Sequence, residues 1–353
     1  MKRPIISLHG TYFGNNYGDI LLIAIFAKWI KDAVPNAIIN LPLADKSKTY
    51  ELPEGTTGIM NLIKSKCLVF CGGGYFGEQP QNKKKWARQN FRRHLIVGLL
   101  AIIFRVPYAI IGVEFGPLSI NWFRKITIYI AKRAKVVVVR NDESLEFLRE
   151  RGVKHVILAA DAVLTLADES GLKHLDNNKI LIHIQGIYKM PKKYVDFVKI
   201  LTEVLKLKSI KRKLCFISDN YGVDYSDENY LKIFKILDEN EIPYEICPYR
   251  GYKDMIERIK ETPFVITTKL HVGITAASLG IRPFSVWVHP KTKRFHKQIQ
   301  NNDFCISMAD VNEKHIKLLF QYFECNNYSL PATVKQKANI NRIELVKFLK
   351  KSL

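Results

Sequence analysis

The chain has 353 residues, of which 47% are hydrophobic and 11% aromatic, and its 55 lysines and arginines outnumber its 33 acidic residues to give a net charge of +22. This composition excludes an intrinsically disordered chain, and the length is enough for about two globular domains. Such an excess of positive charge favours negatively charged partners such as anionic phospholipid, phosphorylated substrates or nucleic acid.

The first half of the chain alternates strand and helix patterns. We expect strands at 4–9, 37–41, 67–71, 108–112, 135–139 and 155–158, and helices at 19–32, 86–104, 122–133 and 142–150. Short apolar runs that alternate with amphipathic helices are typical of parallel βαβ units.

A polar segment at 167–178 interrupts this alternation, and we interpret it as a linker. Beyond it we expect strands at 179–184, 213–218, 244–246, 264–267 and 284–288, helices at 192–207, 226–240, 252–261 and 273–279, and two further helices at 312–322 and 336–351. The fold class is therefore α/β, with two Rossmann-like doubly wound domains facing a cleft. The predicted domains are 1–168 and 179–309, followed by a helical tail at 310–353.

Several classes of protein are disfavoured. The chain has no zinc-finger spacing, RNA-binding aromatic motif or helix-turn-helix pattern, so nucleic acid is the least favoured partner. The six scattered cysteines form no CxxC, so we expect reduced thiols, no metal site and a cytoplasmic protein. The N-terminus lacks the apolar core of a signal peptide. Arg105 and Pro107 interrupt the apolar region 95–113, so neither half is expected to span a membrane.

The most informative stretch follows the apolar run 264–266. Lys269 comes just after this expected strand, and His271 follows at the start of a helix of small residues that Gly280 closes. The carboxyl ends of parallel strands are where ligands bind, and helix N-termini present free amides to anions. Lys269 and His271 are therefore predicted to flank a site for negative charge.

A second cation follows the next expected strand. Lys291 begins the helix after the strand at 284–288, one βα unit beyond His271. Loops at neighbouring strand ends can converge on one anion, so Lys291 is a candidate ligand-binding residue. The alternative is a solvated basic turn.

In the N-terminal half, Arg140 follows the apolar run 136–139. An arginine at a strand end suits bidentate binding of carboxylate or phosphate. The alternative is a pairing with Asp142 or Glu143. Asp161, at the domain junction, is either a hinge cap or a group that orders a cationic pocket.

Two glycine-containing loops also follow strands. The first loop, Gly14–Asp19, is not a GxGxxG fingerprint, so dinucleotide binding is not supported. This loop either lines the cleft or is a capped turn in which Asp19 caps the helix. The second loop, Gly72–Gly74, lets backbone amides approach a ligand closely. The candidate cleft residues in the two loops are Gly14, Asn16, Gly18, Asp19, Gly72, Gly73 and Gly74.

Together these elements resemble the polysaccharide pyruvyl transferase family. The matching elements are the Gly14–Asp19 loop, the triple glycine with Phe76-Gly77, Arg140 with Ser144, Ala160-Asp161, Lys269-Leu270-His271, and Pro290-Lys291 with Phe295. The resemblance implies a GT-B-like fold. It also implies transfer of the enolpyruvyl unit of phosphoenolpyruvate onto two hydroxyls of a sugar, which forms a cyclic pyruvate ketal and releases phosphate.

Three functional positions carry over from the resemblance: Arg140, His271 and Lys291. The family usually has arginine where this chain has Lys269, and lysine keeps the charge but loses the bidentate fork. We expect His271 to act as a general acid, because a histidine side chain titrates near neutral pH. Arg140, Lys291 and Lys269 are expected to bind the anionic groups of the donor.

The resemblance further implies a glycan or lipid-linked sugar as acceptor and no cofactor or metal. Acceptor contacts are expected from the N-terminal loops, at Tyr12, Tyr17, Tyr75 and Glu78. We expect a cytoplasmic protein that binds an anionic surface at the inner face of the membrane.

Two other functions remain alternatives. One is a nucleotide-sugar glycosyltransferase of the same architecture, which needs a pocket for the nucleotide base. The other is a non-catalytic polyanion-binding protein, which would not need a histidine among cations at a strand end.

Overall fold

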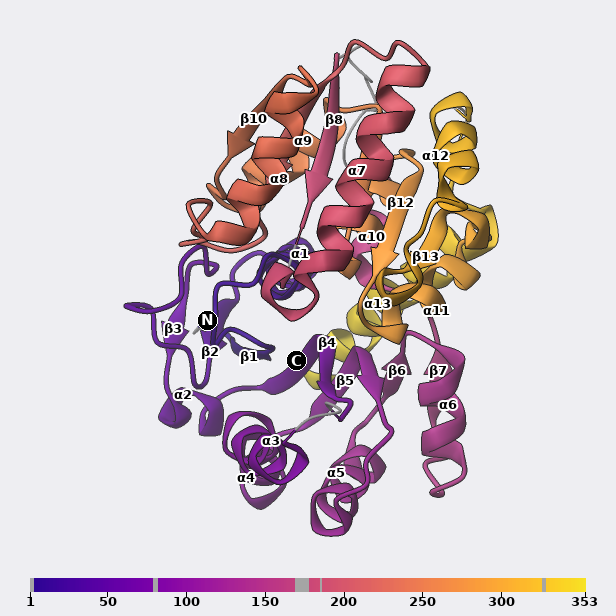
Figure 1. The fold of residues 1–353 in the computed structure, drawn as a ribbon. Helices are drawn as coiled ribbons and strands as arrows, with labels where there is room; N and C mark the ends of the chain where they lie inside the picture. The colour runs from indigo at the N-terminus through magenta and orange to yellow at the C-terminus, as the bar shows by residue number, and fades with distance from the viewer. Residues whose placement is uncertain (1–2, 79–81, 169–177, 185, 326–327) are drawn as a thin grey trace. The chain divides into compact units, whose positions relative to one another are not determined.

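The computed structural model describes residues 3–78, 82–168, 178–184, 186–325 and 328–353. It divides the chain into two compact units (Figure 1). Unit 1 comprises Met1–Val163 and Lys335–Leu353, and unit 2 comprises Leu164–Val334. Each unit is a parallel sheet with helices, so the predicted pair of Rossmann-like domains is confirmed.

Unit 1 has a seven-stranded parallel sheet in the order β3-β2-β1-β4-β5-β6-β7. The strands are β1 (Ile5–His9), β2 (Ile38–Leu41), β3 (Thr56–Thr57), β4 (Cys67–Phe76), β5 (Tyr108–Phe115), β6 (Val137–Val139) and β7 (Val156–Leu158). The helices are α1 (Tyr17–Ala33), α2 (Ile59–Ile63), α3 (Lys83–Asn90), the π-helical turn η1 (Phe91–Leu95), α4 (Ile96–Ile103), α5 (Asn121–Arg133), α6 (Asp142–Arg149) and, at the chain's end, α13 (Ala332–Ser352). The 3₁₀ segment η2 (Ala162–Asp168) spans the boundary between the two units.

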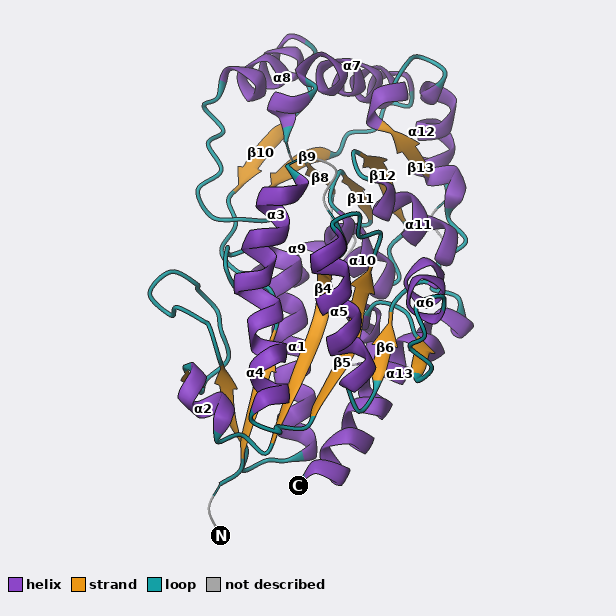
Figure 2. Cartoon of the chain, turned by 90° about the horizontal axis from the view of Figure 1, so that it is seen from below, coloured by secondary structure: helices purple, strands orange, loops and turns teal. Residues whose placement is uncertain are grey.

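Helices cover both faces of this sheet, which is why β4 and β5 read as almost continuous apolar runs. Helices α3, α4 and α5 lie side by side on one face (Figure 2). Helices α1 and α13 pack on the other, where a side chain at Gly112 of β5 would meet Phe26 and Asn341. No helix in the described residues is long and apolar enough to cross a membrane, and the apolar region 95–113 divides into α4 and β5.

The triple glycine lies within β4 rather than after it. The predicted strand 67–71 continues to Phe76, still paired with β5 through an irregular register. Gly72 and Gly73 have φ of +40° and +92°, values that side-chain-bearing residues rarely adopt. A Cβ on Gly72 would lie 2.8 Å from Leu22, so the glycine also lets α1 pack closely on the strand.

Unit 2 has a six-stranded parallel sheet in the order β10-β9-β8-β11-β12-β13. The strands are β8 (Lys179–His183), β9 (Lys213–Ile217), β10 (Tyr244–Cys247), β11 (Phe264–Thr267), β12 (Pro283–Trp287) and β13 (Cys305–Ser307). The helices are α7 (Pro191–Leu207), α8 (Glu228–Glu239), α9 (Tyr252–Lys260), α10 (Leu270–Ser278), α11 (Pro290–Gln298) and α12 (His315–Glu324), with 3₁₀ turns η3 (Ile187–Lys189), η4 (Asn302–Phe304) and η5 (Met308–Asp310).

The structure divides the chain differently from the predicted limits 1–168, 179–309 and 310–353. The expected tail is not one element, because α12 belongs to unit 2 and most of α13 to unit 1. The Tyr322 hydroxyl of α12 bonds the backbone of Val265, whereas the Asn341 amide of α13 donates to Ala160 O. An apolar helix face does not reveal which of two sheets it will cover. Most of the expected linker 167–178 lies outside the described residues.

Both sheets reverse their strand order at one point, between β1 and β4 in unit 1 and between β8 and β11 in unit 2. In open parallel sheets, ligands bind beyond the carboxyl ends of the strands at this point. The strand ends at these two positions are therefore the first places to look for a site.

Candidate active site

In unit 2 the chain turns sharply between β11 and α10, and buried threonines hold the turn. The Thr267 hydroxyl accepts from Lys269 N at 2.9 Å and donates to Lys269 O at 3.3 Å. Thr268 N donates to the carbonyl of His183, the last residue of the neighbouring strand β8. These bonds fix the backbone of Lys269, which is the N-cap residue of α10.

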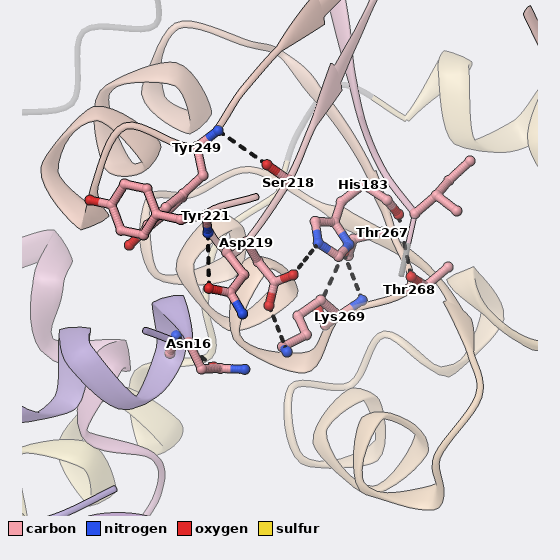
Figure 3. A network of polar contacts seen from close by, with 12 residues as sticks. Asn16, His183, Ser218, Asp219, Tyr221, Tyr249, Thr267, Thr268 and Lys269 are labelled. Atoms are coloured by element: carbon pink, nitrogen blue, oxygen red, sulfur yellow. Dashed lines mark hydrogen bonds and ion pairs between the residues drawn. The ribbon is translucent and has the colours of Figure 1, made fainter. Parts of the chain in front are cut away.

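The side chain of Lys269 contacts the carboxylate of Asp219, which follows β9, the strand on the far side of β8 (Figure 3). Asp219 Oδ2 lies 2.6 Å from Lys269 Nζ, and its Oδ1 lies 3.1 Å from His183 Nε2. Burial alone would raise the pKa of Asp219, but His183 and Lys269 hold it well below its usual range. An ionised aspartate thus fixes both a lysine and a histidine at the switch point of this sheet.

His271 is the second residue of α10, and it is 8% exposed. The small residues of this helix bring it close to the sheet: a Cβ on Gly273 would lie 3.4 Å from Ser285 Oγ. His271 is therefore held at the amino end of a closely packed helix, where backbone amides favour negative charge. The structure places it where the sequence predicted.

Lys291 is the second residue of α11, which begins at Pro290 after β12. The N-cap His289 accepts from Lys291 N through its Nδ1 at 3.3 Å. Strands β11 and β12 are adjacent and parallel, with Thr267 opposite Ser285. The structure therefore brings Lys269, His271 and Lys291 to the same edge of one sheet.

Arg140 lies in unit 1, just after β6, and it is buried between two carboxylates. Its Nη2 lies 2.6 Å from Glu114 Oε2, and its Nη1 lies 2.8 Å from Asp161 Oδ2. Burial opposes its charged form, but Glu114 and Asp161 outweigh burial and raise the pKa of Arg140 above its usual value. Asp161 also accepts from Val163 N, so it both caps the following turn and orders the cation. Donor binding by Arg140 stays a prediction, and a ligand there would share the guanidinium with these carboxylates.

The N-terminus of α1, at the end of the loop that follows β1, is capped by a different residue from the one expected. Asn16 is the N-cap of α1, and its side chain accepts from Gly18 N at 3.2 Å. Gly18 and Asp19 lie inside the first turn of the helix, which begins at Tyr17. The predicted cap at Asp19 is wrong because the helix begins two residues earlier than the pattern indicated. Ligand contacts by Gly14, Asn16, Gly18, Asp19 and the triple glycine stay predictions.

A hydrogen-bonded aromatic cluster occupies the switch point of the unit 1 sheet. His9, the last residue of β1, contacts the Tyr12 hydroxyl through Nδ1 at 2.9 Å and His94 Nδ1 through Nε2 at 3.0 Å. The Tyr75 ring stacks on His94, with centroids 4.4 Å apart. Burial lowers the pKa of His9 to about 3 and that of His94 well below its usual value. The cluster is therefore neutral at physiological pH.

This cluster bears on the predicted acceptor residues. Tyr12, Tyr17 and Tyr75 are buried within unit 1, and the Tyr12 hydroxyl also accepts from Leu43 N. Glu78 accepts from Ser119 and forms an ion pair with Lys83. Their roles as acceptor-binding residues stay predictions, and the described contacts give Tyr12 and Glu78 structural partners.

Sequence reasoning missed Asp219, Glu114 and His94. Asp219 follows the strand β9 by two residues, so the rule that singled out Lys269 and Arg140 would also have found it. Glu114 was detectable as the one acid in the apolar run of β5. His94 carried no signal, since its partner His9 is 85 residues away.

One group of potential metal ligands occurs among the described residues, at the β9–β10 pair. Atoms of Cys215, Glu245 and Cys247 lie within 4.8 Å of one another. The two carboxylate oxygens of Glu245, however, form ion pairs with Lys179 at 2.7 Å and Lys213 at 2.8 Å. The carboxylate is thus already neutralised by lysines, and the expectation of no metal stays a prediction.

Comparison with known proteins gives one family. Residues 16–290 match the family model described as polysaccharide pyruvyl transferase. A comparison with curated protein sequences gave no match. The match includes Arg140, Lys269 and His271 and ends one residue before Lys291.

Several solved structures share the fold. The UDP-GlcNAc 2-epimerase of Methanocaldococcus jannaschii is 13% identical with a TM-score of 0.65, over 97% of this chain and 99% of that one. The Neisseria meningitidis UDP-GlcNAc 2-epimerase, bound to UDP-GlcNAc, is 12% identical with a TM-score of 0.61, over 99% and 100%. S. aureus MnaA, in a structure with UDP, is 10% identical with a TM-score of 0.60, over 100% and 98%. At these identities the similarity shows the fold alone, and that fold is of the GT-B class.

Proposed function

Because the chain belongs to the polysaccharide pyruvyl transferase family, and is therefore a transferase, we propose that it moves the enolpyruvyl group of phosphoenolpyruvate onto two hydroxyls of a sugar. The products are a cyclic pyruvate ketal on the sugar and inorganic phosphate. The acceptor is a glycan or a lipid-linked sugar at the cytoplasmic face of the membrane, and the reaction needs no cofactor or metal.

The observation that carries this proposal is the edge of the unit 2 sheet. Lys269 is the N-cap of α10 and His271 is its second residue. Lys291 is the second residue of α11, which follows the adjacent strand β12. Phosphoenolpyruvate carries a carboxylate and a phosphate, so its site needs several cations together with helix-end amides. Asp219 pairs with Lys269 at 2.6 Å and holds the lysine at this edge of the sheet.

The chemistry assigns a distinct task to the histidine. A proton added to the methylene carbon of phosphoenolpyruvate makes the central carbon electrophilic, and His271 donates that proton as general acid. A sugar hydroxyl then forms a bond to the central carbon. The carbon–oxygen bond to phosphate breaks, the second hydroxyl adds to the same carbon, and the ketal closes. One hydroxyl proton restores His271 and the other leaves with phosphate, so the reaction balances.

The cations stabilise the negative charge that develops on the departing phosphate. Asp219 acts as a positioning residue, because its carboxylate holds Lys269 Nζ in one place. Arg140 is a less direct candidate for donor binding than Lys291, because both of its terminal nitrogens already donate to carboxylates.

The test is a transfer assay with the purified chain. We would incubate it with phosphoenolpyruvate and a panel of glycan and lipid-linked acceptors, and measure phosphate release together with ketal formation by mass spectrometry. The proposal predicts acceptor-dependent phosphate release from phosphoenolpyruvate. Transfer of a sugar from a nucleotide sugar instead would make the chain a glycosyltransferase and contradict the proposal.

The role of His271 is tested by His271→Ala against a matched control. His315, the first residue of α12, is a histidine at the start of another helix of unit 2. We expect His271→Ala to lower turnover by at least about 100-fold while phosphoenolpyruvate still binds, because general acid catalysis is typically worth that much. His315→Ala should behave as wild type. Turnover equal in the two variants would remove His271 from the mechanism.

A further inference from the structure

The positive charge of the chain is concentrated in one segment of unit 1. Residues 79–141 contain one acidic residue, Glu114, which is buried on Arg140. The lysines and arginines in the same segment are Lys83, Lys84, Lys85, Arg88, Arg92, Arg93, Arg105, Arg124, Lys125, Lys132, Arg133, Lys135 and Arg140. Apart from Arg140, most of these cations belong to the α3–α5 layer, which we define as the helices α3, η1, α4 and α5 on one face of the sheet (Figure 2).

A basic cavity opens on this layer. It has a volume of about 1040 Å³ and no acidic lining residue. Six of its lining residues are cations: Lys83, Lys84, Lys85, Arg88, Arg92 and Arg93. Within the part of the chain that the structure describes, Lys83 pairs with Glu78, while no acidic partner is found for Lys84, Lys85, Arg88 or Arg92. The cavity is therefore suited to several phosphate groups.

The arrangement of these cations is unfavourable for the helix itself. Lys83, Lys84 and Lys85 occupy the first turn of α3, the positive end of the helix dipole, where acidic residues are preferred. Lys84, Arg88 and Arg92 are spaced four apart, so like charges face one another along the helix. A bound anion would relieve both repulsions, which points to an anionic partner rather than to a solvated face.

Large apolar side chains are exposed on the same layer. Ile103 and Phe104, at the end of α4, are 68% and 47% exposed, and Trp122 and Tyr129 on α5 are 43% and 41% exposed. Trp122, Lys125, Tyr129 and Lys132 recur at the spacing of one helix face, so aromatic and basic residues alternate along it. Aromatic and aliphatic side chains among cations are typical of helices that lie in a membrane interface.

We propose that unit 1 docks on an anionic phospholipid bilayer through the α3–α5 layer. The cavity cations bind lipid phosphates, and Trp122, Phe104 and Ile103 enter the interface between headgroups and acyl chains. Nucleic acid would explain the cations but leave the exposed apolar residues at the end of α4 without a function. This proposal rests on the proposed function in one respect only, namely that the acceptor lies at the membrane.

The first test is sedimentation with vesicles, without donor or acceptor. The vesicles are phosphatidylcholine alone or mixed in equal parts with phosphatidylglycerol. The variant Lys84→Gln/Arg88→Gln/Arg92→Gln is compared with Lys199→Gln/Lys206→Gln/Lys211→Gln, which removes the same charge from unit 2. Neither variant should lower the unfolding midpoint, since all six residues are exposed.

We expect wild type to bind the anionic vesicles and not the neutral ones, with binding weakened by salt. The α3 variant should lose about 100-fold in affinity, because each cation near an anionic surface contributes roughly fivefold. The unit 2 variant should stay within a few-fold of wild type. Equal binding to neutral vesicles, or equal losses in the two variants, would overturn the proposal.

Tryptophan fluorescence gives an independent readout that keeps the native charge. Trp29 and Trp86 are buried and Trp287 ends β12 in unit 2, so Trp122 is the exposed tryptophan of the α3–α5 layer. We expect a vesicle-induced blue shift that disappears in Trp122→Phe. Binding without that shift, or stronger binding to single-stranded RNA at equal phosphate concentration, would contradict bilayer docking. Because neither assay involves transfer, failure of docking and failure of the proposed reaction are distinguishable.

Discussion

The two sheets end their first strands in the same residue type but surround it differently. His9 ends β1 and His183 ends β8, each buried at the point where the strand order of its sheet reverses. The partners of His9 are the Tyr12 hydroxyl and His94, both neutral. The partner of His183 is Asp219, which also binds Lys269.

This difference indicates which of the two sheets has charged side chains available for catalysis at its carboxyl edge. In unit 1 the switch-point histidine His9 bonds to the neutral groups of Tyr12 and His94, and Arg140 is held by two carboxylates. In unit 2 the charged network of His183, Asp219 and Lys269 reaches the start of α10, and this helix carries His271 in its first turn. We infer that the first network stabilises its unit and that the second positions reacting groups.

Removal of the charge of Asp219 should have the largest effect on stability. Asp219→Asn leaves Lys269 next to a neutral amide in a largely buried site, and loss of one partner of a buried pair costs about 3 kcal/mol. The unfolding midpoint should fall by about 6–12 °C in calorimetry. The control Asp224→Asn alters an exposed aspartate that bonds only locally to Ser226, and should cost less than about 1 kcal/mol. Equal shifts would mean that the buried charge network contributes nothing.

Acid should weaken unit 1 through His9. Its folded pKa of about 3 lies below the ordinary 6.5, so the unfolded chain binds a proton first and stability is lost as pH falls from 6.5 towards 3. At pH 5 this costs about 2 kcal/mol. Asp219 keeps its full contribution at pH 5, because the stability that its lowered pKa provides is lost only when pH falls below the unfolded value of 3.8.

The measurement is urea unfolding at pH 7 and pH 5. His296 in unit 2 is also buried, with a pKa lowered to about 4, so the contribution of His9 is isolated by comparing wild type with His9→Gln. The variant should lose less stability between the two pH values. An identical loss in wild type and variant would show that His9 is not buried in its neutral form.

The smallest expected effect concerns a single hydroxyl of the neutral network. Tyr12→Phe removes the oxygen that joins His9 Nδ1 and Leu43 N, which leaves one buried and one partly buried polar group without that partner. The cost should be about 1–2 kcal/mol, a shift of a few degrees in the unfolding midpoint. Tyr188→Phe, at an exposed tyrosine, is the control. A shift as large as that of Asp219→Asn would erase the contrast between the two networks.

Much of this picture was predictable from local sequence. Apolar runs and helical spacing indicated the main strands of both sheets, and the residue types at strand ends located Lys269, His271 and Lys291. These features depend on neighbours within a few residues, which is why patterns in a single sequence reveal them.

The remainder depends on contacts between distant residues. The glycines of β4 read as a loop after the strand because consecutive glycines are typical of loops, yet pairing with β5 keeps them in the strand at positive φ. Arg140 read as a ligand-binding residue because Glu114 and Asp161 lie 26 and 21 residues away. The helix α13 read as part of a tail because nothing local shows that it returns to unit 1.

The central claim is that the edge of the unit 2 sheet binds phosphoenolpyruvate. It is tested most directly by thermal-shift titration at fixed ionic strength with phosphoenolpyruvate, 2-phosphoglycerate, inorganic phosphate and a panel of nucleotide sugars. The proteins are wild type, Lys291→Ala and, as a matched control, Lys293→Ala at an exposed lysine two residues further along α11. We predict saturable stabilisation by phosphoenolpyruvate above the other anions, lost in Lys291→Ala and kept in Lys293→Ala. Stabilisation by a nucleotide sugar instead, or an equal response to every anion, would contradict the account.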